Sequence, residues 1–208
     1  MNSDELYKKI QNGEISKEEF QKQISLEYIK TAQHSIIDTN RGLRTGIPEI
    51  IYGEYKTYDQ TVEIINRALS DKEFVIISRF QDNQKLYKTF IDKYPVQIDK
   101  NICVIGNISE PKSSVLVISG GSADHPIAKE VELTLKALQC KPIIFEDRGI
   151  AHPTRVLEAI KSGIEQEVKA IVVVAGMEGA LATFVSSMIN LPVIGVPTSV
   201  GYGFHAKE

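Results

Sequence analysis

A glutamate between glycines, in the stretch GMEGAL of residues 176–181, directly follows the apolar run of residues 170–175. The run is typical of a buried strand, which delivers the carboxylate of Glu178 to the strand's carboxyl end. Gly176 and Gly179 leave room for a ligand, and a carboxyl group with few polar neighbours can act as a general acid or base. The structural alternative is a favourable charge in the first turn of a helix, stabilised by about 1 kcal/mol or less. The pattern favours the functional role.

A second glycine-rich loop, SGGSADHP at residues 119–126, lies between another apolar run and a helical pattern. Gly120 and Gly121 allow backbone amides to approach an anion closely, and Ser122 or Asp124 can cap the following helix. A binding loop and a plain capped turn fit this pattern equally well. The loop has neither a G-x-G-x-x-G fingerprint nor a Walker lysine, so it does not indicate a dinucleotide-binding fold or a P-loop.

Two further loops carry candidate anion-binding groups. The motif PTSVGYG places Thr198, Ser199 and Gly201 after the last apolar run, as a backbone-rich cradle for a phosphate or carboxylate. A plain loop is equally compatible with that motif. Arg148 and Arg155, in the segment DRGIAHPTR, can pair with a substrate anion, although exposed arginines in such loops are more often solvated.

A charged, glycine-rich segment near the N-terminus, DTNRGLRTGIPEIIYGEYK, is too patterned to be a slack linker. Arg41 and Arg44 are three residues apart, so in a helical conformation they share a face and can clamp a phosphate or carboxylate. The equal alternative is an internal salt-bridge cluster with Asp38 and Glu49. Lys56 closes the same segment.

Short apolar runs that alternate with amphipathic segments fill the chain from Glu73 onward. Apolar strands separated by helices of a dozen residues indicate a parallel sheet covered on both faces, a three-layer α/β/α doubly wound fold. Such sheets bind ligands at the carboxyl ends of their strands, where the loops above lie. The predicted strands are residues 73–79, 101–107, 114–121, 141–147, 170–176 and 191–199, and the helices are residues 82–94, 125–139, 154–166 and 178–190.

The first third of the chain is polar and has mostly helical patterns, at residues 3–13, 16–33 and 57–70. Ser16 and Glu19 form a capping-box pattern at the start of the second helix. We therefore predict a mostly helical N-terminal region (1–110) with the Arg/Gly-rich signature, followed by an α/β core (111–208).

Composition excludes several classes of protein. The 208 residues carry 24 basic and 27 acidic side chains, a formal net charge of −3, which gives no reason to expect nucleic acid or an anionic membrane as partner. The polar N-terminus has no apolar signal core and no apolar run is long enough to span a bilayer, so we expect a cytoplasmic protein. Cys103 and Cys140 lack metal-type spacing and are expected to be core residues, and the histidines suggest no metal site.

Together, the motifs resemble a known family. SGGSADHPIAKE is similar to the strand, loop and helix of the aminoimidazole ribonucleotide (AIR) carboxylase, or PurE, superfamily. RGLRTGIPEIIYGEYKT, VVVAGMEGAL and VPTSVGYG resemble a narrower group, the LarB family of pyridinium-3,5-biscarboxylate mononucleotide synthases. The likeness runs from Asp38 to Lys207, with four motifs in the right order.

This resemblance implies a PurE-like fold and a reaction in two parts. Nicotinic acid adenine dinucleotide is carboxylated at C5 of its pyridinium ring with CO2 or bicarbonate, and its phosphoanhydride is hydrolysed to release AMP. A nucleophile adds to the electron-poor ring, C5 then attacks CO2, and a base removes the C5 proton. The resemblance also implies magnesium for the hydrolysis, with ligands not assigned, and a homo-oligomer, an octamer with sites shared between subunits.

The resemblance also assigns roles to residues. It implies that Glu178 removes the C5 proton and that Asp124 with Ser122 handles the carboxylate and CO2. The residues expected to bind substrate are Arg41, Arg44, Glu49, Lys56, Gly120, Gly121, Arg155, Gly176, Met177, Gly179, Thr198, Ser199 and Gly201.

Three departures from the family pattern stand out. Thr39 and Asn40 replace two histidines, and Thr154-Arg155 replaces a His-Arg pair. The family's nucleophilic cysteine, which lies downstream of VPTSVGYG, has no counterpart up to Glu208, so we expect the natural chain to continue. Two alternatives stay open: a purine-pathway AIR carboxylase or mutase, and a non-catalytic nucleotide-binding protein.

Overall fold

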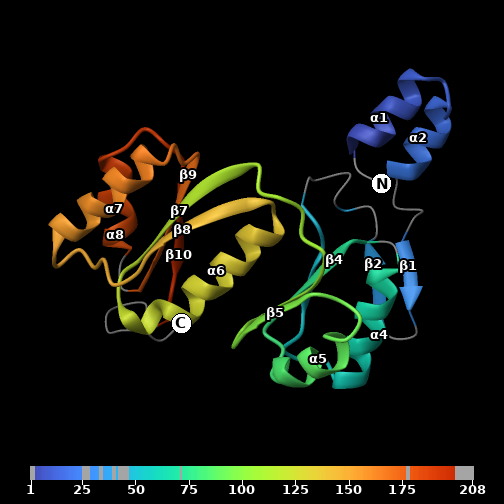
Figure 1. The fold of residues 1–208 in the computed structure, drawn as a ribbon, viewed down its shortest axis with the longest axis horizontal. Coiled ribbons are helices and arrows are strands. Elements are labelled where there is room, and N and C mark those ends of the chain that lie inside the picture. Colours follow the sequence, from blue (N-terminus) through green and yellow to red (C-terminus); the bar gives the residue numbers. More distant parts are fainter. Residues whose placement is uncertain are drawn as a thin grey trace. The chain divides into compact units, whose positions relative to one another are not determined.

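The computed structural model describes residues 3–24, 29–32, 35–38, 41, 47–70, 72–176 and 179–199. The chain forms two compact units, one of residues 1–98 and 103–107 and the other of residues 99–102 and 108–208 (Figure 1). We call them unit 1 and unit 2, and each has its own sheet and buried core. Across these described ranges, no helix is long and apolar enough to cross a membrane.

Unit 1 begins with two short helices and a pair of antiparallel strands. These elements are α1 (Ser3–Gln11), α2 (Lys17–Ile24), β1 (Ile29–Ala32) and β2 (Ser35–Asp38). The capping box predicted before α2 is confirmed. The Ser16 backbone N–H donates to Glu19 Oε2 over 2.9 Å, and the Glu19 N–H donates to Ser16 Oγ over 3.0 Å.

The rest of unit 1 is a four-stranded sheet in the order β3-β4-β6-β5, with two helices. The elements are β3 (Ile50–Tyr52), α4 (Tyr58–Leu69), β4 (Phe74–Ser78), α5 (Asn83–Phe90), β5 (Val96–Asp99) and β6 (Ile102–Gly106). Helix α4 buries Ile64, Ile65 and Ala68, whose spacing places them on one helical face. They pack with Val75 and Ile77 of β4, so the apolar face of the helix covers this strand.

The prediction of a mostly helical N-terminal region is wrong, because this region is a mixture of helices and strands. The helix predicted over residues 16–33 ends at Ile24, and β1 begins at Ile29. Isoleucine and the threonine two residues later are β-branched, and such side chains favour strands over helices. The strands β4 and β6 lie where the sequence predicts them.

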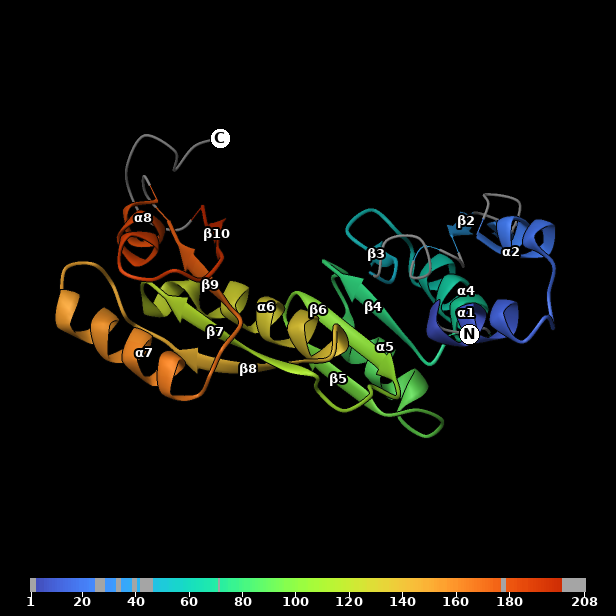
Figure 2. The same ribbon diagram turned by 90° about the horizontal axis from the view of Figure 1, so that it is seen from above.

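Unit 2 is built on a sheet of four parallel strands in the order β10-β9-β7-β8 (Figure 2). The strands are β7 (Ser113–Ser119), β8 (Cys140–Phe145), β9 (Ala170–Ala175) and β10 (Val193–Pro197). The helical elements are the 3-10 turn η2 (Ser122–Asp124), α6 (His125–Ala137), α7 (Pro153–Glu165) and α8 (Ala180–Ser187). The predicted α/β class with a helix-flanked parallel sheet is confirmed.

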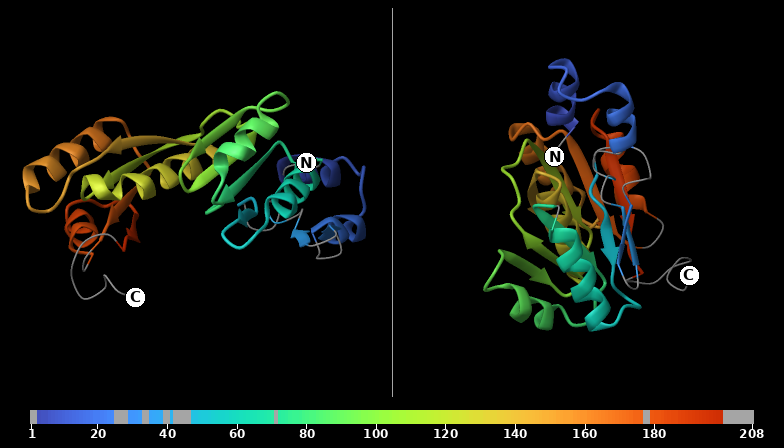
Figure 3. Two further views of the ribbon diagram at one scale, coloured as in Figure 1. Left: turned by 90° about the horizontal axis from the view of Figure 1, so that it is seen from below. Right: turned by 90° about the vertical axis from the view of Figure 1, so that its right-hand side faces the viewer.

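Helices cover both faces of this sheet, as strands that are apolar on both sides require. Along β7, Val115 and Val117 pack with side chains of α6, whereas Leu116 and Ile118 pack with those of α7 and α8. Figure 1 shows α6 on one side of the strands and α7 and α8 on the other. Helix α6 lies along β7 and β8, and is the yellow helix in the left view of Figure 3. Alternate residues therefore enter two different cores, which makes the strand a continuous apolar run.

The strand order creates a switch point between β7 and β9. The chain passes from β7 to β8 on one side and then returns to β9 and β10 on the other, so the connections after β7 and β9 run in opposite directions. A crevice at such a point, outside the carboxyl ends of the strands, is the usual ligand site of a doubly wound sheet. A ligand site in this fold is therefore expected at the loops after β7 and β9.

Candidate functional site

Asp124 is the buried polar centre of this edge of unit 2, with only 6% of the residue exposed. The Gly121 backbone N–H donates to its Oδ2 over 2.9 Å, and Thr198 Oγ1 donates to its Oδ1 over 2.7 Å. Thr198 follows β10 and lies 74 residues further along the chain. One carboxylate therefore joins the loop after β7 to the end of β10. Asp124 makes no cap hydrogen bond to α6, but its bond to the Gly121 N–H caps the short turn η2 that leads into this helix.

Backbone hydrogen bonds connect the strand ends around Asp124. The Thr198 N–H donates to the Ala175 carbonyl over 3.1 Å, which continues the pairing of β10 with β9. The Arg148 N–H donates to the Ser119 carbonyl over 2.8 Å, which ties the segment after β8 to the end of β7. The four strand ends are thus a single hydrogen-bonded edge.

Two glycines at this edge are needed because backbones approach closely. A Cβ atom at Gly149 would lie 2.9 Å from the Gly120 carbonyl oxygen, and a Cβ atom at Gly120 would lie 3.3 Å from both Ala175 Cβ and Asp124 Oδ2. Both distances are tighter than ordinary van der Waals contact. Gly120 therefore has a packing role in the loop, and its role in substrate binding stays a prediction.

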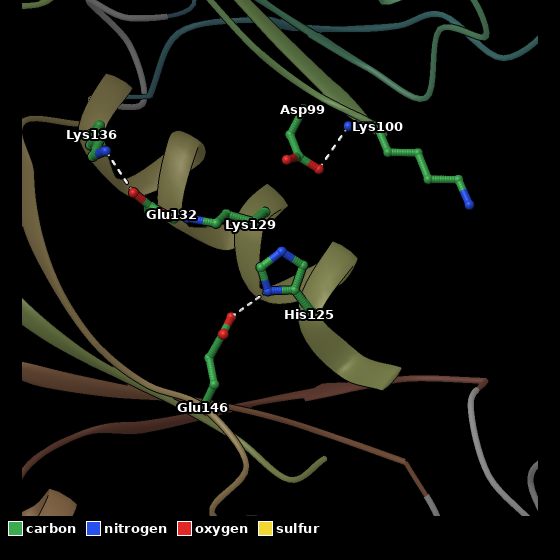
Figure 4. A network of polar contacts seen from close by, with 7 residues as sticks. All are labelled: Asp99, Lys100, His125, Lys129, Glu132, Lys136 and Glu146. Atoms are coloured by element: carbon green, nitrogen blue, oxygen red, sulfur yellow. Dashed lines mark hydrogen bonds and ion pairs between the residues drawn. The ribbon is translucent and has the colours of Figure 1, made fainter. Parts of the chain in front are cut away.

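A second polar pair, His125 and Glu146, begins next to Asp124 in the sequence and lies at the other edge strand of the sheet, β8 (Figure 4). His125 Nδ1 lies 2.8 Å from Glu146 Oε1, and Glu146 directly follows β8. The two side chains are 48% and 37% exposed, so the pair is accessible to solvent. Sequence reasoning missed this pair. The available signal was the position of Glu146 at the carboxyl end of a predicted strand.

Charged side chains continue from His125 along the same face of α6 (Figure 4). Lys129 and Lys136 each donate to one carboxylate oxygen of Glu132, both over 2.6 Å. The hydrogen bond to Glu132 raises the pKa of Lys129, and the charge of Glu146 adds to this effect. Partial burial acts to raise the pKa of Glu132, but the hydrogen bonds from the two lysines outweigh it and lower that pKa. Both shifts favour the charged forms of Lys129 and Glu132, so this ion pair is stable at neutral pH.

Several of the predicted site residues meet at this edge. Those at or directly after the carboxyl ends of β7, β9 and β10 are Gly120, Gly121, Ser122, Asp124, Gly176, Gly179, Thr198 and Ser199. Arg155 lies in α7, with its Nη1 3.5 Å from Asp147 Oδ2. Those in unit 1 are Arg41, Glu49 and Lys56. Those outside the described residues are Arg44, Met177, Glu178 and Gly201.

The two cysteines do not offer an accessible nucleophile at this edge. Cys103 is fully buried in β6, where burial raises the pKa of its thiol to about 12, and it packs in the core of unit 1 as predicted. Cys140 begins β8, at the opposite end of that strand from Glu146, and is partly buried. A thiol needs its thiolate form to attack, so Cys103 is inert in the folded chain.

The described residues do not fit a resident metal ion. Within these ranges, no group of three or more His, Cys, Asp or Glu side chains is placed to hold one. At the edge itself, both oxygens of Asp124 already accept hydrogen bonds from the protein. Among the described residues, none is therefore assigned as a protein ligand of magnesium.

Comparison with known proteins agrees with this architecture. Residues 29–95 match the family described as "LarB/PurE-like N-terminal domain", and residues 114–205 match "AIR carboxylase". The chain is 37% identical over 202 residues to the uncharacterised protein MJ0165 of Methanocaldococcus jannaschii, an overlap of 92% of this chain and 79% of that protein. The helix-flanked parallel sheet and the second match define a PurE-like member of a carboxylase family. Since both matched domains are in one chain, the protein belongs to the LarB family within the PurE superfamily.

Proposed function

We propose that the protein converts nicotinic acid adenine dinucleotide, with CO2 or bicarbonate, into pyridinium-3,5-biscarboxylic acid mononucleotide and AMP. This would be the first step of nickel-pincer nucleotide synthesis, carried out by a cytoplasmic homo-oligomer. The observation that carries the proposal is the presence of a LarB-type N-terminal domain and an AIR carboxylase domain in the same chain. A purine-pathway carboxylase needs only the second of these.

The geometry around Asp124 supports a carboxylation site at the switch point. The carboxylate fixes the loop after β7 against the end of β10, so the loop is held in one conformation before substrate binds. Ser122 is exposed on the same turn, and its hydroxyl can donate to an oxygen of CO2 or of the new carboxylate. Preorganised donors of this kind stabilise charge that develops during reaction.

Glu178 completes the proposal as the base that removes the C5 proton. It directly precedes the N-cap of α8, Gly179, in the loop after β9. The strands β7 and β9, which these two loops follow, flank the switch point, and this topology supports a role for both loops in one reaction.

The test is incubation of the protein with nicotinic acid adenine dinucleotide, magnesium and ¹³C-labelled bicarbonate, followed by mass spectrometry. We expect AMP and a mononucleotide that carries one labelled carboxyl group. Saturable binding without either product would favour a nucleotide-binding protein. Turnover of aminoimidazole ribonucleotides in place of the dinucleotide would favour the purine pathway. A parallel reaction with a chelator tests the expected need for magnesium.

The substitution Glu178→Gln is expected to retain dinucleotide binding and to lose carboxylation by at least about 10²-fold, because it removes the proton acceptor and keeps the side-chain volume. Binding by calorimetry and label incorporation by mass spectrometry measure the two effects separately. Normal carboxylation by this variant would leave Glu178 with only a helix-terminus role.

A further inference from the structure

Two consecutive residues at the start of α6 contact opposite edges of the sheet. Asp124 accepts a hydrogen bond from Thr198, which follows β10, and His125 pairs with Glu146, which follows β8. In the strand order β10-β9-β7-β8, β10 and β8 are the two edge strands. The loop after β7 therefore has a polar group on each side, one buried and one open to solvent.

The contact with Glu146 fixes the form of the His125 imidazole. A carboxylate can only accept a hydrogen bond, so Nδ1 carries the proton in this contact. In the neutral ring Nε2 is then the basic nitrogen, and the side chain is about half exposed. A carboxylate that orients an imidazole in this way is the usual arrangement of a histidine that transfers protons.

Basic side chains lie on the elements that carry this pair and on the segment that follows β8. Lys129 lies one turn further along α6, Arg148 lies between β8 and α7, and Arg155 lies in the first turn of α7. The N-terminal end of α6, which begins at His125, adds the positive end of a helix dipole. The neighbouring acids, Glu146 and Asp147, are each paired with a basic side chain, and Lys129 is paired with Glu132.

We infer that His125 is the general base for hydrolysis of the phosphoanhydride, and that Glu146 positions its imidazole. The inference rests on the proposed function. In the proposed substrate, nicotinic acid adenine dinucleotide, the two reacting centres are a ring carbon and a phosphorus atom, and a ribose separates them. Carboxylation at the switch point and hydrolysis beside β8 would then use the two sides of one loop.

The step is balanced with water as the only co-reactant. As the water oxygen bonds to phosphorus, its proton passes to His125 Nε2. The bond from phosphorus to the bridging oxygen breaks, and the leaving phosphate monoester takes the bonding electrons. The imidazolium then releases its proton to solvent. Glu146 stays hydrogen-bonded to Nδ1 throughout and stabilises the charged ring.

The first experiment compares AMP release by the wild type, His125→Gln and the matched control His152→Gln. His152 is exposed at the start of α7, and no role is assigned to it. We expect His125→Gln to lower kcat for AMP release about 10²-fold, with KM within about twofold, and His152→Gln to match the wild type. An unchanged kcat in His125→Gln, or an equal loss in His152→Gln, overturns the inference.

The second experiment tests the positioning role of Glu146 by ¹⁵N NMR of the His125 ring. In the wild type we expect the neutral ring to show the Nδ1–H tautomer. In Glu146→Ala we expect the Nε2–H tautomer and a rate of AMP release lowered about tenfold. In Glu146→Asp we expect the Nδ1–H tautomer and the rate of AMP release to be partly restored. An unchanged tautomer in Glu146→Ala overturns this role. A wild type that forms no AMP overturns the proposed function and this inference together, whereas an active wild type with an equally active His125→Gln overturns the inference alone.

Discussion

The substitution Asp124→Asn is expected to lower carboxylation by about 10³-fold while the protein still folds. The Gly121 N–H can only donate, so the new amide must turn its oxygen toward Gly121 and its NH2 group toward Thr198. The Thr198 hydroxyl can rotate and accept, so both contacts survive and only the charge is lost. We expect a stability cost of about 1 kcal/mol, the difference between a charged and a neutral hydrogen bond.

Variants at Thr198 separate the charge of Asp124 from its anchoring role. Thr198→Ser keeps the hydroxyl and is expected to resemble the wild type. Thr198→Val leaves a buried carboxylate oxygen without its donor, at a cost of about 1–3 kcal/mol in unfolding free energy, and keeps the charge. Label incorporation and chemical denaturation measure both effects. Full activity in Asp124→Asn, with activity lost in Thr198→Val, would show that Asp124 acts only as an anchor.

The substitution Gly106→Ala is expected to destabilise unit 1 by more than about 3 kcal/mol. Gly106 ends β6 with a φ of 113°, and a Cβ atom there would lie 2.2 Å from the Glu73 carbonyl oxygen and 2.7 Å from Phe74 Cα. Both neighbours are backbone atoms. The Gly106 N–H also donates to the Pro95 carbonyl over 2.9 Å, so this strand end is held in place. To remove the clash of the new Cβ atom with the backbone of Glu73 and Phe74, β6 would have to move away from β4.

Gly13→Ala is the matched control for this substitution. Gly13 also has a positive φ, 70°, but a Cβ atom there would meet nothing within 4 Å. Backbone strain alone is then expected to cost about 1 kcal/mol. Seven of the eight tyrosines lie within residues 1–98 and the chain has no tryptophan, so tyrosine fluorescence during urea unfolding reports mainly on unit 1. Equal stability of the two variants would show that β6 relaxes without cost.

The sequence pattern predicted the sheet of unit 2 because its strands are apolar on both faces and end at glycines or polar loops. The same reasoning failed in residues 16–33, where a polar helical pattern runs without a break into the β-branched residues of β1. Local propensity could not show that Ile29–Ala32 pairs with Ser35–Asp38, since pairing depends on another segment.

The candidate site was predictable as a set of loops but not as a set of contacts. Parallel strands bring their carboxyl ends to one edge, so the loops after β7, β9 and β10 were correctly expected together. The bond between Asp124 and Thr198 depends on strand order, which the sequence pattern does not determine. Asp124 was instead compatible with a local cap, and Glu146 was overlooked because a charge after a strand is ordinary.

The hydrogen bond between Asp124 and Thr198 also limits how the sequence can drift. Loss of the Thr198 hydroxyl alone leaves an oxygen of buried Asp124 without its donor, so a neutral series of substitutions that removes the hydroxyl must also change Asp124. Relatives that lose the hydroxyl at the position of Thr198 are therefore expected to have replaced the carboxylate as well. Among related sequences, residues 124 and 198 are then expected to change together, as a result of this one hydrogen bond.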